Sequence, residues 1–380
     1  MARMELAGTV GMKTLNLALQ GGGSHGAFTW GVLDALLEDG RVLLEGLSGT
    51  SAGALNAATL ASGWAVAARE GRDPRAGARA GLARLWEQVM RWDSLGAVQR
   101  AWARLLWGGM APTVAADWLQ PLRGLSPYEA NPLGLNPLRK LLQEEVDFAA
   151  VAHGPLKVFV SATHVGTGRA VVFTGPHLDA DAVMASACLP LLFRAVEIDG
   201  EAYWDGGYSA NPALAPLIRY CSSSDLMLVQ INPLRVEQLP RSRAAILERV
   251  NELTFNASLL QQMRGIEFIN GLIARGLLRE GPCKPVRIHR IDGGEAIRAW
   301  PSSSRSSTDA AMIRALFQLG REQAAAWLDR HFEALGQHGT VDIRADYLDD
   351  TRLPPPPTAP RRPPGRFRPW LAQLLRRRPR

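Results

Sequence analysis

Two glycine-rich motifs, about one strand-helix-strand unit apart, constrain the fold of this chain more than any other feature. The first is GGGSHG at residues 21–26, and the second is GTSAG at residues 49–53. Each follows a short apolar run and precedes a run with helical spacing. The second has the form G-x-S-x-G, in which small flanking residues let a serine sit on a strained turn between a strand and a helix. Ser51 is therefore a candidate nucleophile.

The first motif has a complementary use. A glycine loop at the start of a helix can present free backbone N–H groups, and such groups stabilise an oxyanion. A serine nucleophile and its oxyanion hole would then both lie in the first 53 residues of the chain.

Composition and cysteine usage place the chain in a broad class. Its 380 residues are 47% hydrophobic, enough to bury a large core, so we expect one catalytic domain with appended helices. Its three cysteines are odd in number and widely spaced, which favours a reducing compartment, with the cytoplasm as the expected location. The first twenty residues show no secretory signal pattern, and no uncharged apolar run reaches the ~18 residues that a spanning helix needs.

The positive charge of the chain is concentrated at its C-terminal end. The formal net charge is +7, but residues 354–380 carry eight arginines and no acidic residue, so residues 1–353 stand at −1. The folded body is therefore nearly neutral, and we expect no nucleic-acid partner. Within residues 366–380, aromatic and leucine residues at helical spacing are flanked by arginines. This pattern predicts a basic amphipathic helix that contacts an anionic membrane or a lipid-body surface; a disordered basic end is the alternative.

The order of predicted elements is that of an α/β fold. Residues 15–68 predict strand, loop, helix, strand, turn and helix in turn. Residues 70–140 contain five of the eleven tryptophans and predict a helical insertion, whose apolar faces pack on the sheet or, alternatively, form a lid or a membrane-contacting cap. Later strands are predicted at 156–162, 169–173 and 226–231, a hairpin at 196–204, and helices at 244–278 (one or two) and 309–335. We divide the chain into a catalytic core at 13–217, a continuation with C-terminal helices at 218–345, and a Pro/Arg-rich tail at 346–380.

A serine nucleophile needs a base to take its proton. Three histidines follow it in the order that α/β-hydrolases use, namely His289, His331 and His338. In that fold, however, the serine generally follows several strands, whereas Ser51 follows only the second. The arrangement therefore favours a different family.

The chain resembles the patatin-like phospholipases, in which a Ser-Asp dyad replaces the triad. The resemblance covers residues 15–217 and rests on four motifs in family order: GGGSHG at 21–26, GTSAG at 49–53, ASACLP at 185–190, and DGG at 205–207 followed by Asn211-Pro212. It implies a mostly parallel central sheet with helices on both faces, Ser51 as nucleophile, Asp205 as general base, and hydrolysis of lipid acyl esters. It implies no metal or organic cofactor, and the oligomeric state stays open.

The remaining site residues follow from the same motifs. We expect oxyanion donors among Gly21, Gly22, Gly23, Ser24 and Ala52, and supporting roles for Gly26, Gly49, Gly53, Gly206 and Gly207. The chain departs from the family at His25, where Lys or Arg is common. A histidine there predicts either a charge that varies with pH or a side chain that simply lines the helix start.

Three alternatives compete with this interpretation. Asp292-Gly293-Gly294 also follows a strand-like run, although we expect it to be a strand-end turn. The first motif also fits the dinucleotide fingerprint G-x-G-x-x-G, with Glu45 placed 19 residues after it as a ribose ligand, which would make the chain an oxidoreductase. Finally, a lipid-surface binding or scaffold protein could carry the dyad as a vestige.

Overall fold

The computed structural model describes residues 11–94, 126–131, 134, 136–236, 238–278, 284–298, 300, 304–305 and 307–348. These residues belong to one compact unit, which ends at Leu348. The tail predicted at 346–380, with its amphipathic segment at 366–380, therefore lies outside the described residues from position 349 onward. So do residues 95–125 of the predicted insertion.

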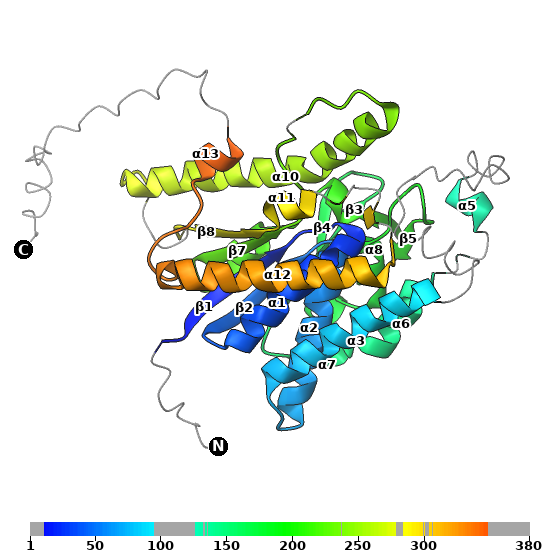
Figure 1. Ribbon diagram of the computed structural model, residues 1–380, viewed down its shortest axis with the longest axis horizontal. Coiled ribbons are helices and arrows are strands. Elements are labelled where there is room, and N and C mark those ends of the chain that lie inside the picture. The colour runs from blue at the N-terminus through cyan, green and yellow to red at the C-terminus, as the bar shows by residue number, and fades with distance from the viewer. Residues whose placement is uncertain are drawn as a thin grey trace, which may run out of the picture. The chain divides into compact units, whose positions relative to one another are not determined.

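An eight-stranded sheet forms the middle layer of the molecule (Figure 1). Its strand order is β5-β6-β3-β2-β1-β7-β8, with β4 paired to β3 outside this path. Strands β1, β2, β3, β7 and β8 are parallel, and the pairs β3–β4, β3–β6 and β5–β6 are antiparallel. The bounds are β1 Lys13–Leu19, β2 Val42–Gly49, β3 Lys157–His164, β4 Ala170–Thr174, β5 Val196–Ile198, β6 Glu201–Asp205, β7 Asp225–Gln230 and β8 Arg287–Asp292. Each strand predicted from the sequence is present, with ends shifted by at most two residues.

Helices cover both faces of this sheet. Residues 244–278, predicted as one or two helices, form the single helix α10. Two short helices, η1 Gly23–His25 and η4 Gly206–Tyr208, follow β1 and β6. The α-helices are α1 Gly26–Asp39, α2 Ala52–Arg69, α3 Pro74–Ser94, α5 Pro127–Ala130, α6 Pro137–Glu145, α7 Phe148–His153, α8 Ala180–Ser186, α9 Ala215–Tyr220, α10 Arg243–Ala274, α11 Gly294–Arg298, α12 Ala310–His331 and α13 Ile343–Tyr347.

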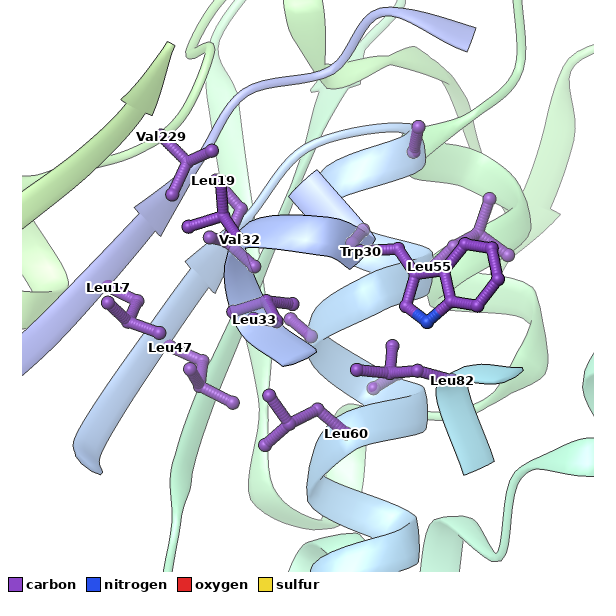
Figure 2. Packing of buried hydrophobic residues seen from close by; sticks show 14 of the residues in the cluster. Leu17, Leu19, Trp30, Val32, Leu33, Leu47, Leu55, Leu60, Leu82 and Val229 are labelled. Atoms are coloured by element: carbon purple, nitrogen blue, oxygen red, sulfur yellow. The ribbon is translucent and has the colours of Figure 1, made fainter. Parts of the chain in front are cut away.

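Alternating side chains of the strands fill two separate cores. In β1, Leu17 and Leu19 face the core shared with α1, α2, α3 and α12, whereas Ala18 faces the core shared with α9 and α10. Figure 2 shows Leu17, Leu19 and Leu47 directed from the sheet toward α1 and α2. Because the side chains of a strand alternate between faces, a sheet that is covered on both faces needs apolar residues at nearly every position. This explains why the parallel strands lack an apolar-polar alternation.

Part of the predicted insertion packs into the first core. Helix α3 buries Leu82, Leu85 and Trp86 against its neighbours, and Trp86 donates from Nε1 to Asn56 Oδ1 of α2 at 3.0 Å. The apolar face of α3 is therefore buried, as predicted, but it packs mainly on the helices α1 and α2 and not on the sheet. The lid alternative for residues 70–140 stays a prediction, because residues 95–125 lie outside the described part of the chain.

Two further predictions concern thiols and membrane spans. Cys188 and Cys221 are buried free thiols, and Cys283 lies outside the described residues. In the part of the chain that the structure describes, none of the helices is both long and apolar enough to cross a bilayer.

Candidate active site

Ser51 lies at a sharp turn between β2 and α2. Its backbone has φ 54° and ψ −122°, a positive φ that L-residues rarely adopt, so the strained turn expected from the motif is present. A Cβ at Gly53 would come within 2.9 Å of Gln20 O, and one at Gly49 would strike the Gly53 backbone. Both motif glycines are therefore required by close backbone contact. The Ser51 side chain does not cap α2, which leaves its hydroxyl available.

The side-chain hydroxyl groups of Ser186 and Thr50 hold this turn in place through hydrogen bonds. Ser186, the last residue of α8, accepts a hydrogen bond from Ser51 N at its Oγ, at 2.9 Å. Thr50 Oγ1 donates to Ala210 O at 2.7 Å and lies 2.6 Å from Ser161 Oγ on β3. These contacts connect the turn to β3 and to the segment after Asp205.

Asp205 is the last residue of β6 and is fully buried. Its Oδ1 accepts a hydrogen bond from Gly207 N at 2.7 Å. Its Oδ2 makes no hydrogen bond of standard geometry within the described structure, although the Ser51 hydroxyl lies close enough to lower the pKa of the carboxyl group. Burial outweighs this hydrogen bonding and raises the pKa of Asp205 from 3.8 to about 7. Near neutral pH the carboxyl group is thus poised between its two protonation states.

The backbone around Asp205 is tightly held. Asp205 N donates to Cys188 O at 2.7 Å, which joins β6 to the 185–190 motif. A side chain at Gly206 would strike Ser161 O, and one at Gly207 would strike the ring of Phe255 on α10. The two glycines after the aspartate are therefore needed for close packing, and they fix the carboxylate in place.

The glycine loop lies directly against the serine turn. A Cβ at Gly21 would lie 2.7 Å from Ser51 Cβ, and one at Gly26 would lie 2.7 Å from Ala52 Cβ. Within the described residues, the N–H groups of Gly22 and Gly23 have no acceptor, and Ala52 begins α2 with its N–H unused by the helix. These are the donors that an oxyanion hole requires.

Gly21 differs from its neighbours in this loop. Its N–H donates to Asn211 Oδ1 at 2.7 Å. The expectation that Gly21 supplies an oxyanion donor is therefore wrong, because the group is already bonded. Gly21 and Asn211 instead hold the loop beside Ser51. Ser24, fully buried in η1, contributes to this packing.

His25 is buried at the start of α1, with 2% of its surface exposed. Its Nε2 lies 2.8 Å from Ser304 Oγ. Burial, and then the charge of Arg305, lowers the pKa of His25 to about 3. The expectation of a charge that varies with pH near neutrality is therefore wrong. His25 is neutral and lines the helix start, which was the other interpretation.

The competing bases lie elsewhere. Asp292 ends β8, where its Oδ1 accepts from Gly294 N at 2.9 Å and its Oδ2 pairs with Arg290 at 2.8 Å. His289 is bonded to Asp225 Oδ1 at 3.0 Å, where β7 begins, and His331 packs against Trp327. No hydrogen bond or ring contact of His338's side chain is found within the described residues. The structure thus brings only Asp205, among these candidates, to Ser51.

Glu45 does not lie where a ribose would bind. Its carboxylate accepts hydrogen bonds from Ser222 N at 2.7 Å, Ser223 N at 2.9 Å and Lys157 Nζ at 2.9 Å. It therefore connects β2 to the loop before β7, near the amino ends of these strands, whereas the glycine loop follows the carboxyl end of β1. This arrangement gives the dinucleotide interpretation no acidic ligand.

Two of the pockets in the described structure have volumes of about 260 and 240 Å³, and neither of these two is lined by Ser51 or Asp205. The second includes Ile231, whose side chain contacts Gly22, so it borders the glycine loop. Within the described residues, no group of three or more His, Cys, Asp or Glu side chains is arranged to hold a metal ion.

Several residues of this site have roles that the sequence did not predict. Ser186 and Asn211 lie within or beside the family motifs, but their contacts to Ser51 N and Gly21 N join residues 135 and 190 positions apart. Ser304 and Arg305, which cover the glycine loop beside His25 and Gly23, lie in a serine-rich stretch with no motif at all. No local signal could have found them.

Comparison with known proteins identifies the family of this chain. The sequence profile described as Patatin-like phospholipase matches residues 17–218, more than half of the chain. The chain therefore belongs to the patatin-like phospholipase family, and its fold is the α/β/α fold of that family.

Two solved structures are similar to this chain at low identity. VipD from Legionella pneumophila is 15% identical, with a TM-score of 0.40, over 84% of this chain and 67% of that one. The heterodimeric ExoU-SpcU complex from the type III secretion system of Pseudomonas aeruginosa is 16% identical, with a TM-score of 0.31, over 85% of this chain and 52% of that one. The chain thus spans about half the length of the second structure. No curated protein sequence matches it.

Proposed function

We propose that this protein is a serine lipid acyl hydrolase in which Ser51 attacks the ester carbonyl and Asp205 is the general base. The observation that supports this most strongly is the buried carboxylate of Asp205. It lies beside the Ser51 hydroxyl, has one oxygen without a standard hydrogen bond, and has its pKa raised to about 7. A base with a pKa near the working pH is efficient at proton transfer.

In the acylation step, Asp205 Oδ2 takes the proton from Ser51 Oγ as the oxygen bonds to the carbonyl carbon. The carbonyl oxygen becomes an oxyanion, which the N–H groups of Gly22, Gly23 and Ala52 stabilise. Each such donor typically contributes ~3 kcal/mol to transition-state stabilisation. When the tetrahedral intermediate collapses, the ester C–O bond breaks and the leaving alcohol takes the proton from Asp205.

Deacylation reverses these roles with water as the nucleophile. Asp205 takes a proton from the water as its oxygen bonds to the acyl carbon, and the same N–H groups hold the second oxyanion. When this intermediate collapses, the bond between Ser51 Oγ and the acyl carbon breaks, the fatty acid leaves, and Asp205 returns the proton to Ser51 Oγ. No imidazole is needed, because the carboxyl group serves as base and then as acid.

The proposed substrates are lipid acyl esters: phospholipids, lysophospholipids or neutral glycerides. The proposed location is the cytoplasm, with peripheral contact to a lipid surface. The predicted contribution of residues 366–380 to that contact lies outside the described structure. A panel of substrates that varies head group and chain length would define the ester class, with each rate measured for the wild type and for Ser51→Ala.

Covalent labelling tests the nucleophile itself. A fluorophosphonate probe should label the wild type and Ser223→Ala but not Ser51→Ala. Ser223 is a suitable control because its hydroxyl bonds Thr14 O near the beginning of β1. Absence of wild-type labelling across pH 6–9 would instead favour the alternative, a lipid-surface binding or scaffold protein with a vestigial dyad.

A further inference from the structure

The first half of α10 carries an apolar stripe that faces solvent. We define the outer stripe as Ile246, Leu247, Val250 and Leu253, whose surfaces are 45%, 45%, 50% and 50% exposed. The spacing of 246, 250 and 253 follows the helical repeat, so these side chains lie on one face. A helix of a globular protein normally buries such a face. Here it is uncovered.

The segment before α10 extends this surface. Val236 and Leu239 are 45% and 77% exposed and lie a few residues before the helix starts. In Figure 1 the green, N-terminal end of α10 stands clear of the sheet at the top of the view. The surface is therefore accessible from outside the molecule.

The opposite face of the same helix contacts the segment that follows Asp205 in the candidate active site. Phe255 packs on Gly207 and meets the ring of Tyr208 at 5.2 Å. Ser258 Oγ accepts from Asn211 N at 3.1 Å, and Gln262 Oε1 accepts from Leu214 N at 2.7 Å. The outer stripe thus lies one helix diameter, roughly 10 Å, from the segment that begins with Asp205.

The charged side chains around the outer stripe are mostly positive. Arg235, Arg241 and Arg243 are exposed, and none of them forms an ion pair with a described residue. The two described acidic residues in this part of α10 interact with Arg305: Glu252 pairs with it at 3.6 Å, and Glu248 is partly buried and interacts with it electrostatically. Exposed apolar side chains bordered by exposed arginines are complementary to an anionic lipid surface.

We propose that the outer stripe is the surface through which this protein docks on anionic lipid aggregates, with Arg235, Arg241 and Arg243 contacting the head groups. Docking there brings the turn after Asp205, which contacts the opposite face of α10 through Phe255, to about one helix diameter from the lipid. A second copy of the chain is a poorer occupant, because a two-fold contact through this face would bring the same arginines together. The role of this surface in catalysis rests on the proposed function, but the binding of lipid vesicles to it does not.

Vesicle binding by the full-length Ser51→Ala protein tests this proposal without consuming the lipid. The test variant adds Val250→Glu and Leu253→Glu. The control adds Phe268→Glu and Leu277→Glu, which are 59% and 60% exposed in the second half of the helix and beyond it and bring the same charge change. Residue 268 lies about 27 Å along the helix from residue 250. Matched thermal melts of both variants establish that each is folded.

We expect the test pair to weaken binding to vesicles of phosphatidylcholine and phosphatidylglycerol at least tenfold, and the control pair less than twofold. Arg241→Ala with Arg243→Ala should weaken binding by about fivefold per arginine on these vesicles, and hardly at all on pure phosphatidylcholine. Equal binding by test and control variants overturns the proposal. So does a test pair that changes only a monomer–dimer equilibrium measured by light scattering.

Hydrolysis of a soluble short-chain ester separates this proposal from the proposed function. With Ser51 restored, the test pair should keep the wild-type kcat/KM on that ester. If the wild type hydrolyses no ester yet binds vesicles through the outer stripe, the proposed function fails and the docking surface stands. If binding depends on residues 354–380 and not on the outer stripe, the docking surface fails and the catalytic proposal stands.

Discussion

The same tripeptide, Asp-Gly-Gly, occurs at the end of two strands of this sheet. The two copies form the same turn, but their carboxylates differ in burial and in hydrogen-bond partners. Asp205 at the end of β6 and Asp292 at the end of β8 each accept a hydrogen bond from the amide two residues ahead, at 2.7 and 2.9 Å. This local contact is what the tripeptide encodes. A motif of three residues therefore predicts a turn, and it says nothing about the chemistry of the carboxylate.

The surroundings of the two carboxylates decide what each can do. Asp205 is fully buried, its second oxygen lacks a standard hydrogen bond, and its pKa is raised to about 7 with Ser51 alongside. The side chain of Asp292 is 38% exposed, and its second oxygen pairs with Arg290 at 2.8 Å. The carboxylate of Asp205 can therefore accept a proton from Ser51, whereas that of Asp292 is paired with the guanidinium group of Arg290.

The largest difference between the two aspartates should appear in the catalytic activity of their alanine variants. We expect Asp205→Ala to lower kcat/KM for a soluble ester by about 10⁴-fold or more, because Ser51 loses its base. Asp292→Ala should stay within about threefold of the wild type. Steady-state kinetics on the two purified variants would measure this, and a large loss in Asp292→Ala with little in Asp205→Ala would reverse the assignment.

The free energies of unfolding of Asp205→Asn and Asp292→Asn should also differ, and the difference should depend on pH. Between about pH 4 and pH 7 the folded protein keeps a proton on Asp205 that the unfolded chain has lost, so wild-type stability falls as pH rises through this window. Asp205→Asn removes this dependence. The free energy of unfolding of Asp205→Asn, relative to that of the wild type, should therefore increase by roughly 2–3 kcal/mol between pH 5 and pH 8.

Urea denaturation at both pH values measures this difference. Asp292→Asn serves as the control and should show no comparable gain over that interval. A gain of the same size in both variants would mean that burial does not distinguish the two carboxylates.

A smaller effect is expected when the support of the serine turn is removed. Ser186→Ala leaves Ser51 N–H buried without its acceptor, a cost of about 1–3 kcal/mol. We expect kcat to fall about 10- to 100-fold while KM changes little, because the turn is misplaced and not lost. Arg290→Ala, which removes the partner of Asp292, should leave kcat near the wild-type value. A lower melting temperature with unchanged kcat would show that Ser186 supports only the fold.

The smallest effect should come from the other titratable group beside the serine turn. His25 has its pKa lowered to about 3, so it stays neutral throughout pH 5–9. His25→Gln keeps a polar group facing Ser304 and should change kcat/KM less than about threefold at every pH. A shift in the apparent pKa of the rate profile would assign the titration to His25 instead of Asp205.

The sequence predicted the strands and the long helices, because these depend on local periodicity. The pairing of Ser51 with Asp205 was expected only from the resemblance to the patatin-like phospholipases, and it stays a proposal. The sequence did not predict that Asn211 occupies the Gly21 amide, that residues 304 and 305 cover His25, or that α10 holds the turn after Asp205. Those contacts join residues that are distant in the chain, and no periodic pattern records them. The division at 217 and 345 stays a prediction.

The pH dependence of fluorophosphonate labelling tests most directly whether Asp205 activates Ser51. We predict that the wild-type labelling rate rises with pH, with an apparent pKa near 7, and levels off above pH 8. Asp292→Asn should follow the same curve, and Asp205→Asn should react at least about 10³-fold more slowly with no inflection. Wild-type labelling rates in Asp205→Asn, or loss of labelling in Asp292→Asn, would contradict the assignment of the base.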